Sequence, residues 1–261
     1  MSETARRIVV VGAGSGIGAA TAAHFFERGD HVLAVDLRPN NTPASQHATC
    51  DLRDPSDIAR LLSEIGDDWD TLAHVAGVPG TAPAADVLKV NYLGMRLMTE
   101  GMLPLLRRGG SVVAVASTAA LGGEQRVDIL DGLLELTDGD AVAQWQAGQD
   151  QDFPVYTTSK QAAILFIKRV AGSAWSKYGV RINTVSPGPV QTPILSDFEQ
   201  TMGKDTLDLV RATVGRHATV DDVVPLIAFL TSPESRWING QDIQVDAGFI
   251  AGITNGTPIS L

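Results

Sequence analysis

The sequence predicts an α/β fold: a doubly wound parallel sheet of about seven strands with helices on both faces. Short apolar runs alternate with longer stretches of helical periodicity along the whole chain, as expected for buried strands joined by helices. The chain of 261 residues is 44% hydrophobic and contains no internal repeat or low-complexity linker. We therefore expect residues 1–261 to form a single domain with one large core.

The expected strands are short runs rich in apolar and β-branched residues. They lie at 8–11, 31–36, 45–52, 71–77, 111–117, 180–186 and 242–248. The longest helical stretches lie between them, at 86–107 and 155–178. Ligands bind at the carboxyl ends of the strands in such a sheet, so functional residues are expected directly after the apolar runs.

A glycine-rich turn follows the first expected strand. Gly12, Gly14, Gly16 and Gly18 stand between that strand and a helical stretch. Strand, turn and helix together are typical of a dinucleotide site, because the turn lets the backbone approach a pyrophosphate and the first helical amides attract phosphate. Asp36 ends the second expected strand, where a carboxylate can bind ribose hydroxyls and repel an added 2′-phosphate. The sequence therefore predicts NAD as the cofactor and disfavours NADP.

Tyr156 and Lys160 lie four residues apart in a helical stretch, so their side chains share one face of the helix. A cation beside a phenol stabilises the phenolate, and we expect Lys160 to lower the pKa of Tyr156 toward working pH. A phenol tuned in this way suits general acid and base catalysis. The pair is weak evidence alone, since its spacing also arises by chance, and the glycine turn gives it weight.

Together, the Gly-x-x-x-Gly-x-Gly turn and the Tyr-x-x-x-Lys pair resemble those of the classical short-chain dehydrogenase/reductase family, which has a Rossmann-type fold. The resemblance runs over nearly the whole chain. Asn91 and Ser117 match the family's active-site asparagine and serine. The run HVAG, from His74 to Gly77, is similar to the family's Asn-Asn-Ala-Gly, with histidine and valine replacing both asparagines.

The resemblance implies a mechanism and a cofactor site. Tyr156 would exchange a proton with the substrate oxygen, while Ser117 hydrogen-bonds that oxygen. Lys160 would lower the tyrosine pKa and bind the nicotinamide ribose, and Asn91 would hold a water that links Lys160 to solvent. Asp51 would contact adenine, and the run 186–193 would bind the carboxamide end of nicotinamide. The expected cofactor contacts are Gly12, Ser15, Gly16, Ile17, Gly18, Asp36, Asp51, Leu52, Ala76, Gly77, Tyr156, Lys160, Pro187, Gly188, Val190 and Thr192.

Residues 121–153 look like an insertion. Ser117 and Tyr156 are 39 positions apart, well beyond the usual family spacing. The insertion carries apolar residues at helical spacing, typical of amphipathic helices that cover a surface. It resembles the insertion of the bacterial 3α-hydroxysteroid dehydrogenase/carbonyl reductase subgroup, which alters subunit packing there. The insertion could be a surface excursion, part of a subunit interface or a wall of the substrate site, and the sequence does not choose among these roles. We expect at least a homodimer, with a dimer slightly favoured over a tetramer.

The composition limits the expected binding partners and the expected cellular compartment of the protein. A net charge of −10 argues against nucleic acid as the main partner. The apolar runs predict no membrane span and no export signal. Cys50 is the single cysteine, which favours a reducing, cytoplasmic setting, and we expect it to be a buried small residue. The five histidines show no metal-ligand spacing, so no metal site is expected.

The substrate is expected to be an uncharged small molecule. Residues 190–215 should form a lid over the site, and no Arg or Lys falls in its helical part, from 194 onward, before Lys204. This favours a secondary alcohol or ketone of alicyclic, terpenoid, steroidal or aromatic type. The candidate apolar lining residues of the lid are Ile194, Leu195, Phe198, Met202 and Leu207.

Other functions retain part of this pattern. A non-catalytic dinucleotide sensor would keep the glycines and Asp36, but it has no need of Ser117 and Tyr156. A sugar-nucleotide-modifying enzyme of the extended branch shares Tyr-x-x-x-Lys, yet it has a glycine turn one residue shorter and a longer chain. An enoyl reductase would carry its lysine two places later, at a position occupied here by Ala162.

Overall fold

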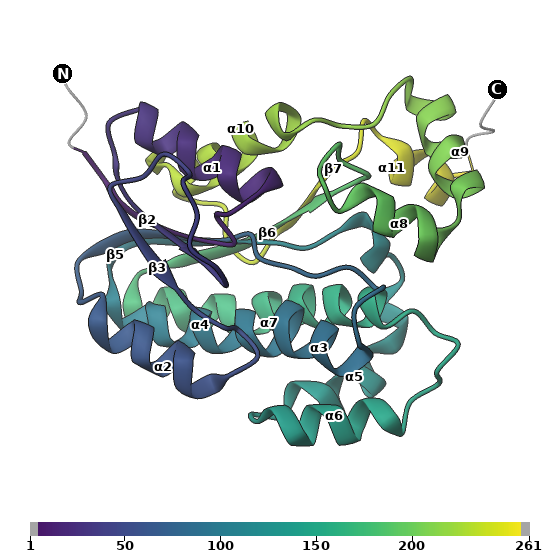
Figure 1. Cartoon of the computed structure of the whole chain (residues 1–261), viewed down its shortest axis with the longest axis horizontal. Helices are drawn as coiled ribbons and strands as arrows, with labels where there is room; N and C mark the ends of the chain where they lie inside the picture. Colours follow the sequence, from purple (N-terminus) through teal and green to yellow (C-terminus); the bar gives the residue numbers. More distant parts are fainter. Residues whose placement is uncertain (1–4, 257–261) are drawn as a thin grey trace.

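A computed structural model describes residues 5–256, apart from the side chain of Met202. Its centre is a seven-stranded, all-parallel sheet with the strand order β3-β2-β1-β4-β5-β6-β7 (Figure 1). The expected fold class and all seven expected strands are confirmed. The strands are β1 (Arg7–Val11), β2 (His31–Asp36), β3 (Gln46–Thr49), β4 (Trp69–His74), β5 (Leu106–Val115), β6 (Arg181–Pro187) and β7 (Asp242–Val245).

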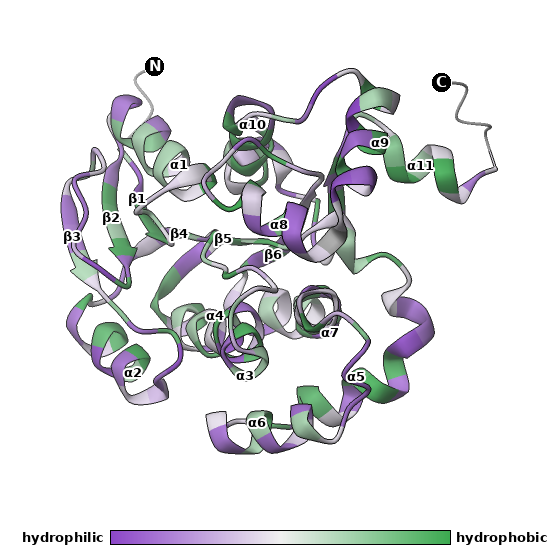
Figure 2. Ribbon diagram, turned by 45° about the vertical axis from the view of Figure 1, so that its right-hand side comes forward, coloured by the Kyte–Doolittle hydropathy of each residue, from purple (hydrophilic) through white to green (hydrophobic). Residues whose placement is uncertain are grey.

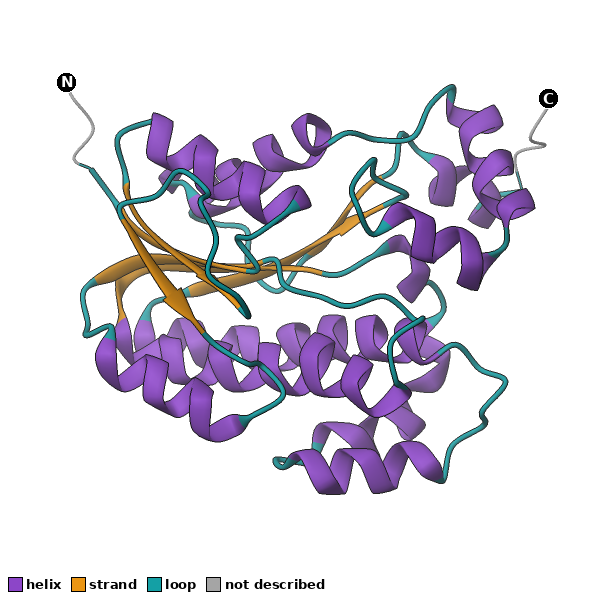
Figure 3. Ribbon diagram, in the orientation of Figure 1, coloured by secondary structure: helices purple, strands orange, loops and turns teal. Residues whose placement is uncertain are grey.

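Helices cover both faces of the sheet (Figures 2 and 3). One layer contains α1 (Gly16–Glu27) and α10 (Val220–Thr231), which pack against each other. The opposite layer contains α2 (Pro55–Glu64), α3 (Ala84–Leu88), α4 (Met95–Met102) and α7 (Val155–Tyr178). Short 3₁₀ turns complete the connections among the described residues: η2 (Leu103–Leu105), η3 (Thr118–Ala120), η4 (Gly123–Arg126) and η5 (Pro233–Ser235).

The core consists of two apolar clusters separated by the sheet. In β1, Val9 and Val11 belong to the cluster under α4 and α7, whereas Ile8 and Val10 belong to the cluster under α1 and α10. Successive side chains of a strand point to opposite faces, and both faces are covered here. This explains why the inner strands, such as β1 and β2, read as continuous apolar runs rather than as alternating patterns.

The expected helix at 86–107 differs from the structure. The helical segment begins at α3 and passes through a π-helical turn, η1 (Lys89–Gly94), before α4 ends at Met102. Pro104 lacks the N–H group that would continue the helix, and the chain turns through η2 into β5. The π turn carries Asn91, and such turns occur frequently at functional sites.

The insertion lies outside the layer formed by α3 and α7 (Figure 1). It contains α5 (Val127–Leu134), which contacts α7, and α6 (Gly139–Ala147), which contacts α3. Arg96 of α4 donates to the carbonyl oxygens of Leu134 and Leu136 at the end of α5. The expected amphipathic helices are therefore present, and they cover helices of their own chain.

Three further helices lie near the carboxyl ends of β6 and β7: α8 (Leu195–Met202), α9 (Lys204–Val214) and α11 (Phe249–Thr254). Helices α8 and α9 occupy the segment expected to form the lid. No helix within residues 5–256 is long and apolar enough to cross a membrane.

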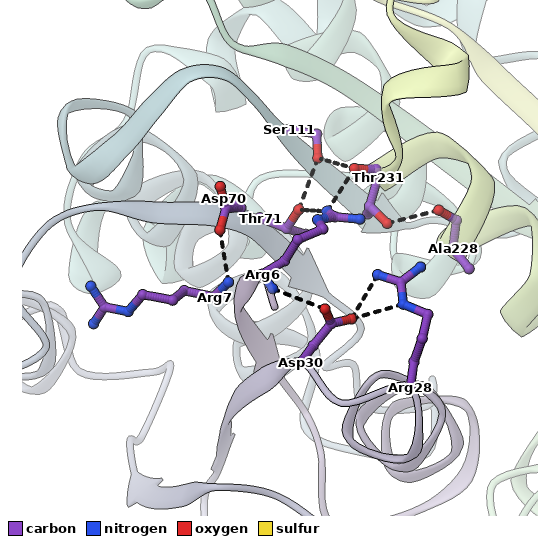
Figure 4. A network of polar contacts seen from close by, with 9 residues as sticks. All are labelled: Arg6, Arg7, Arg28, Asp30, Asp70, Thr71, Ser111, Ala228 and Thr231. Carbon is purple, nitrogen blue, oxygen red and sulfur yellow. Dashed lines mark hydrogen bonds and ion pairs between the residues drawn. The ribbon is translucent and has the colours of Figure 1, made fainter. Parts of the chain in front are cut away.

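A polar network holds the opposite, amino-terminal edge of the sheet together (Figure 4). The Arg6 guanidinium donates to Thr71 Oγ1 and, at 2.7 Å, to the carbonyl oxygen of Thr231 at the end of α10. Ser111 of β5 donates to the same carbonyl, and Asp30 accepts from the Arg6 amide at 3.0 Å. The network ties α10 to β4, to β5 and to Arg6, the residue before β1, at the edge of the sheet away from the predicted site residues.

Candidate active site

A cleft of about 470 Å³ opens at the carboxyl ends of the strands. The structure brings almost all predicted site residues together around it, although they come from segments distant in the sequence. Asn91 is the exception, since it is buried behind the wall of the cleft. The predicted residues that line the cleft are Gly12, Ser15, Gly16, Ile17, Gly18, Asp36, Asp51, Leu52, Ala76, Gly77, Ser117, Tyr156, Lys160, Pro187, Gly188, Val190 and Thr192.

The glycine turn is packed so tightly that side chains are excluded from it. Gly12 has a φ of +86°, and a Cβ there would lie 2.5 Å from the Ala76 Cα. A Cβ at Gly18 would lie 1.9 Å from the Gly12 carbonyl oxygen. Ser15 precedes α1, and its side chain makes no capping hydrogen bond within the described chain. The first amides of α1 therefore face the cleft as donors suited to a phosphate group.

Asp36 lies at the rim of the cleft, beside this turn. Its Oδ2 accepts a hydrogen bond from the Gly14 amide at 2.8 Å. A Cβ at Gly14 would lie 2.8 Å from the same oxygen, so only glycine allows this approach. The carboxylate is thereby fixed where the second strand ends, as expected for a group that binds ribose hydroxyls.

The sequence reasoning missed Arg53, which holds the carboxylate expected at the adenine end of the cleft. Its Nη2 lies 2.7 Å from Asp51 Oδ2, and its Nη1 lies 3.6 Å from Asp86 Oδ2. Hydrogen bonding from Arg53 lowers the pKa of Asp51, so the carboxylate stays ionised. The Asp-x-Arg spacing after the third strand is the sequence signal that could have indicated this pair.

Tyr156 and Lys160 project from the first turns of α7, which begins directly after Pro154. Lys160 Nζ lies 5.7 Å from the centroid of the Tyr156 ring. The same nitrogen donates to the Val115 carbonyl oxygen at 2.9 Å, at the carboxyl end of β5. Val115 was not predicted, because a backbone carbonyl leaves no mark in the sequence.

The expectation that Lys160 lowers the pKa of Tyr156 is wrong for this structure. Burial raises the pKa of Tyr156 to about 12, because a phenolate would lose its hydration, and interaction with Ser117 opposes the rise only in part. Burial also lowers the pKa of Lys160 to about 8. Desolvation is therefore the main cause of both pKa shifts.

Asn91 is fixed by the backbone at the end of the fourth strand. Its Oδ1 accepts from the Val78 amide at 2.7 Å, and its Nδ2 donates to the Val78 carbonyl at 3.0 Å. Nδ2 also lies 3.2 Å from Ser159 Oγ, one residue before Lys160. The asparagine thus joins the π turn to both the β4 loop and α7.

Ser117 stands between the ends of β5 and β6. Its Oγ accepts from the Ala119 amide at 3.2 Å and so caps the 3₁₀ turn η3. Thr118 donates to the Pro187 carbonyl at 3.2 Å, which links this turn to the end of β6. Thr192 lies beside the glycine turn: a Cβ added at Gly16 would be 3.2 Å from Thr192 Cγ2.

Phe198 of α8 closes the cleft over Tyr156. The two rings meet edge to face with their centroids 5.0 Å apart, and Ile194 lines the same end of the cleft. Thr81 donates to Asp197 at 2.9 Å, which fastens α8 to the loop after β4. Of the other lid candidates, Leu195 and Leu207 do not line the cleft within the described residues, and the Met202 side chain lies outside them.

His74 is an unusual residue beside the site. It is 1% exposed, and its Nε2 has no hydrogen-bond partner within residues 5–256. Burial and the nearby charge of Lys160 lower its pKa to about 3. The imidazole is therefore neutral at physiological pH.

Cys50 is buried, as expected, and burial raises its pKa to about 12. It is a packed apolar residue rather than a thiolate. No group of three or more His, Cys, Asp or Glu side chains within residues 5–256 is arranged to hold a metal ion.

Comparison with known proteins identifies the family. A family model described as short chain dehydrogenase matches residues 6–128, and one described as Enoyl-(Acyl carrier protein) reductase matches residues 141–250. A coniferyl-alcohol dehydrogenase from Pseudomonas sp. is 35% identical over 251 residues, covering 95% of this chain and 98% of that protein. The chain belongs to the short-chain dehydrogenase family.

Other members of the short-chain dehydrogenase family agree with this assignment. A 3-alpha-hydroxysteroid dehydrogenase/carbonyl reductase from Comamonas testosteroni is 29% identical, with 94% of this chain and 96% of that protein covered. The crystal structure of a 3-alpha-hydroxysteroid dehydrogenase from Pseudomonas sp. B-0831, complexed with NADH, superposes with a TM-score of 0.81 at 29% identity. It covers 96% of this chain and 98% of that one. The resemblance to this subgroup is confirmed, and the protein is an oxidoreductase of this family.

Proposed function

We propose that this oxidoreductase interconverts an uncharged secondary alcohol and the corresponding ketone with NAD. In the oxidative direction, the alcohol carbon loses a hydride to the cofactor and the hydroxyl loses a proton, giving ketone, reduced cofactor and a proton. The observation that carries the proposal is the position of the Tyr156 phenol. It lies half-buried beside Ser117 and Lys160, in a cleft whose opposite end is the glycine turn.

The chain's own residues supply binding and proton transfer. Gly12, Gly16 and the first amides of α1 would hold the pyrophosphate, since the packing leaves that space to the backbone alone. When bound, the nicotinamide accepts or gives the hydride at its carbon four. Tyr156 would move the proton at the substrate oxygen, while Ser117 Oγ positions that oxygen. Lys160, held at the Val115 carbonyl, would keep positive charge beside the phenol.

Asp36 supports NAD rather than NADP. The Gly14 amide orients its carboxylate toward the place where the adenosine ribose would lie. A 2′-phosphate there would face a fixed negative charge, whereas two ribose hydroxyls could donate to it. Arg38 lies two residues further on and is the group that could offset this repulsion.

The end of the cleft beside Tyr156 supports an uncharged substrate. Apolar side chains of the cleft lining are Val78, Ala82, Pro193, Ile194 and Phe198, and Phe198 packs on the Tyr156 ring. An ionic group placed against these side chains would lose its hydration without gaining a partner, at a cost of several kcal/mol. The names of two relatives support the same type of substrate, since one is an alcohol dehydrogenase and the other a hydroxysteroid dehydrogenase/carbonyl reductase.

A substrate panel tests the proposal. Alicyclic, terpenoid, steroidal and aromatic alcohols are each offered with NAD and with NADP, and the matching ketones with the reduced cofactors, while absorbance of reduced cofactor is recorded. We expect turnover with at least one of these classes and a higher kcat/KM with NAD. Cofactor binding without turnover of any alcohol or ketone would instead indicate a dinucleotide sensor.

A further inference from the structure

A second cavity, of about 370 Å³, lies next to the cleft. This volume is within the range of sites for small organic molecules. Its walls come from the turn after β5, the end of β6, helix α9, the start of α10 and the segment from β7 into α11. The proposed chemistry uses none of these wall residues except Gly188.

The walls of this cavity are mainly apolar. Val210 and Val214 lie four residues apart on one face of α9, and Val245, Phe249 and Ile250 from the β7–α11 segment also line the cavity. Val210 is 6% exposed and Ile250 is 7% exposed, so both are shielded from bulk water. An apolar ligand would gain free energy by filling this space.

The charged groups of the wall are already paired with one another or with the backbone. Arg216 makes two hydrogen bonds to Asp222, at 2.6 and 2.8 Å. Asp246 accepts from the amides of Gly248 and Ile250, both at 2.9 Å. A charged ligand would have to compete with these partners, whereas a neutral one would not.

The cavity adjoins the reacting centre. Thr118 and Ala119, which directly follow Ser117, line it, and Gly188 lines both this cavity and the cleft. Gly188 carries no side chain where the two spaces adjoin, and a Cβ there would lie 3.3 Å from Asp246 Cβ. Phe198 bounds only the cleft, and Val210 bounds only the second cavity. A substrate whose oxygen is held by Ser117 would therefore have Phe198 on the side of the cleft and the second cavity on the side of Gly188.

We propose that the second cavity receives one apolar substituent of the substrate, while the other substituent packs against Phe198. The inference rests on the proposed function and narrows its substrate class. The substrate is a secondary alcohol or ketone with an apolar group on each side of the reacting carbon, and both groups contribute to binding. Substrates with a single small substituent would leave the 370 Å³ empty and bind more weakly.

Binding of a neutral fluorophore tests the cavity without any turnover. N-phenyl-1-naphthylamine is titrated into the wild-type protein and into Val210→Phe and Val214→Phe, which place larger side chains in the cavity. Leu209→Phe is the matched control, since Leu209 is the neighbouring residue of α9 and is 40% exposed. We expect saturable binding to the wild type and the control, and binding weaker by at least about tenfold in both filled variants. Thermal unfolding shows whether each variant is folded. If either Val210→Phe or Val214→Phe fails to fold, the binding measured with the other one tests the proposal. Equal binding by all four proteins, or none by the wild type, overturns the proposal.

A homologous series tests the cavity during turnover. The 1-phenylalkanols from 1-phenylethanol to 1-phenylpentanol lengthen one substituent by a methylene at a time. We expect kcat/KM to rise about fourfold per methylene in the wild type and in Leu209→Phe, and to stay flat in Val210→Phe and Val214→Phe. A flat series in the wild type overturns this inference but leaves the proposed function standing. Failure to oxidise any alcohol contradicts the proposed function, and the fluorophore titration then decides on the cavity alone.

Discussion

Asn91 Oδ1 and Lys160 Nζ meet at Gly77. A Cβ added at Gly77 would lie 3.3 Å from each of these atoms, which is closer than ordinary van der Waals contact. The glycine leaves room for an amide and an ammonium to approach one point of the backbone, and its φ angle is not what favours it. This relationship connects the π turn of Asn91 to the proton-transfer pair of α7.

Gly77→Ala should therefore lower kcat by roughly tenfold to a hundredfold, because a methyl group would displace Lys160 or Asn91 by a few tenths of an ångström. The fold should survive, and calorimetric binding of NAD should change little. Gly172→Ala, in the same helix as Lys160 and with open space around its Cβ position, is the control. Unchanged kcat in Gly77→Ala would show that the contact at Gly77 has no role in turnover.

Asp36→Ala should reduce the preference for NAD over NADP by about tenfold or more, since it removes the carboxylate that would repel a 2′-phosphate. The measurement is the ratio of kcat/KM with the two cofactors, for wild type and variant. A wild-type enzyme that works better with NADP would show that Arg38 dominates and that the role of Asp36 has been misassigned.

His74 should make the protein sensitive to acid. Its pKa is about 3 in the folded protein and about 6.5 when unfolded, so the unfolded chain binds the extra proton between these values. Stability from this group is complete above pH 6.5 and is lost as the pH falls toward 3. Between pH 7 and pH 5 the wild type should lose about 2 kcal/mol more unfolding free energy than His74→Asn. Urea unfolding at both pH values measures this difference, and equal losses in the two proteins would contradict it.

The insertion at 121–153 should limit assembly to a dimer. Arg96 of α4 donates to carbonyls at the end of α5, and Arg126 donates to Gln161 of α7 at 2.6 Å, so the insertion covers these helices within one chain. A covered face cannot pack against another subunit. Light scattering should therefore give a dimer at micromolar concentration. A tetramer would contradict only the prediction that residues 121–153 block further assembly. A strict monomer would contradict the expectation that the chain forms at least a homodimer.

The sequence could predict the elements whose signals are local. The inner strands β1, β2, β4, β5 and β6 were recognisable because burial on both faces demands apolar runs, and the spacing of Tyr156 and Lys160 needed only helical geometry. Three features depend on tertiary structure instead. The π turn places Asn91 where its side chain bonds Val78, thirteen residues earlier in the loop after β4. The pKa of Tyr156 depends on the burial that the lid helps to create, and the second cavity depends on segments far apart in the sequence.

The most direct test of the central claim is the turnover of Tyr156→Phe with the best alcohol of the panel, measured together with calorimetric binding of NAD. The variant removes the hydroxyl that moves the proton and leaves the ring packed against Phe198. We predict that kcat falls by at least about a thousandfold while the Kd for NAD stays within about twofold of wild type. Turnover near the wild-type rate would contradict the assignment of Tyr156 as the proton-transfer group.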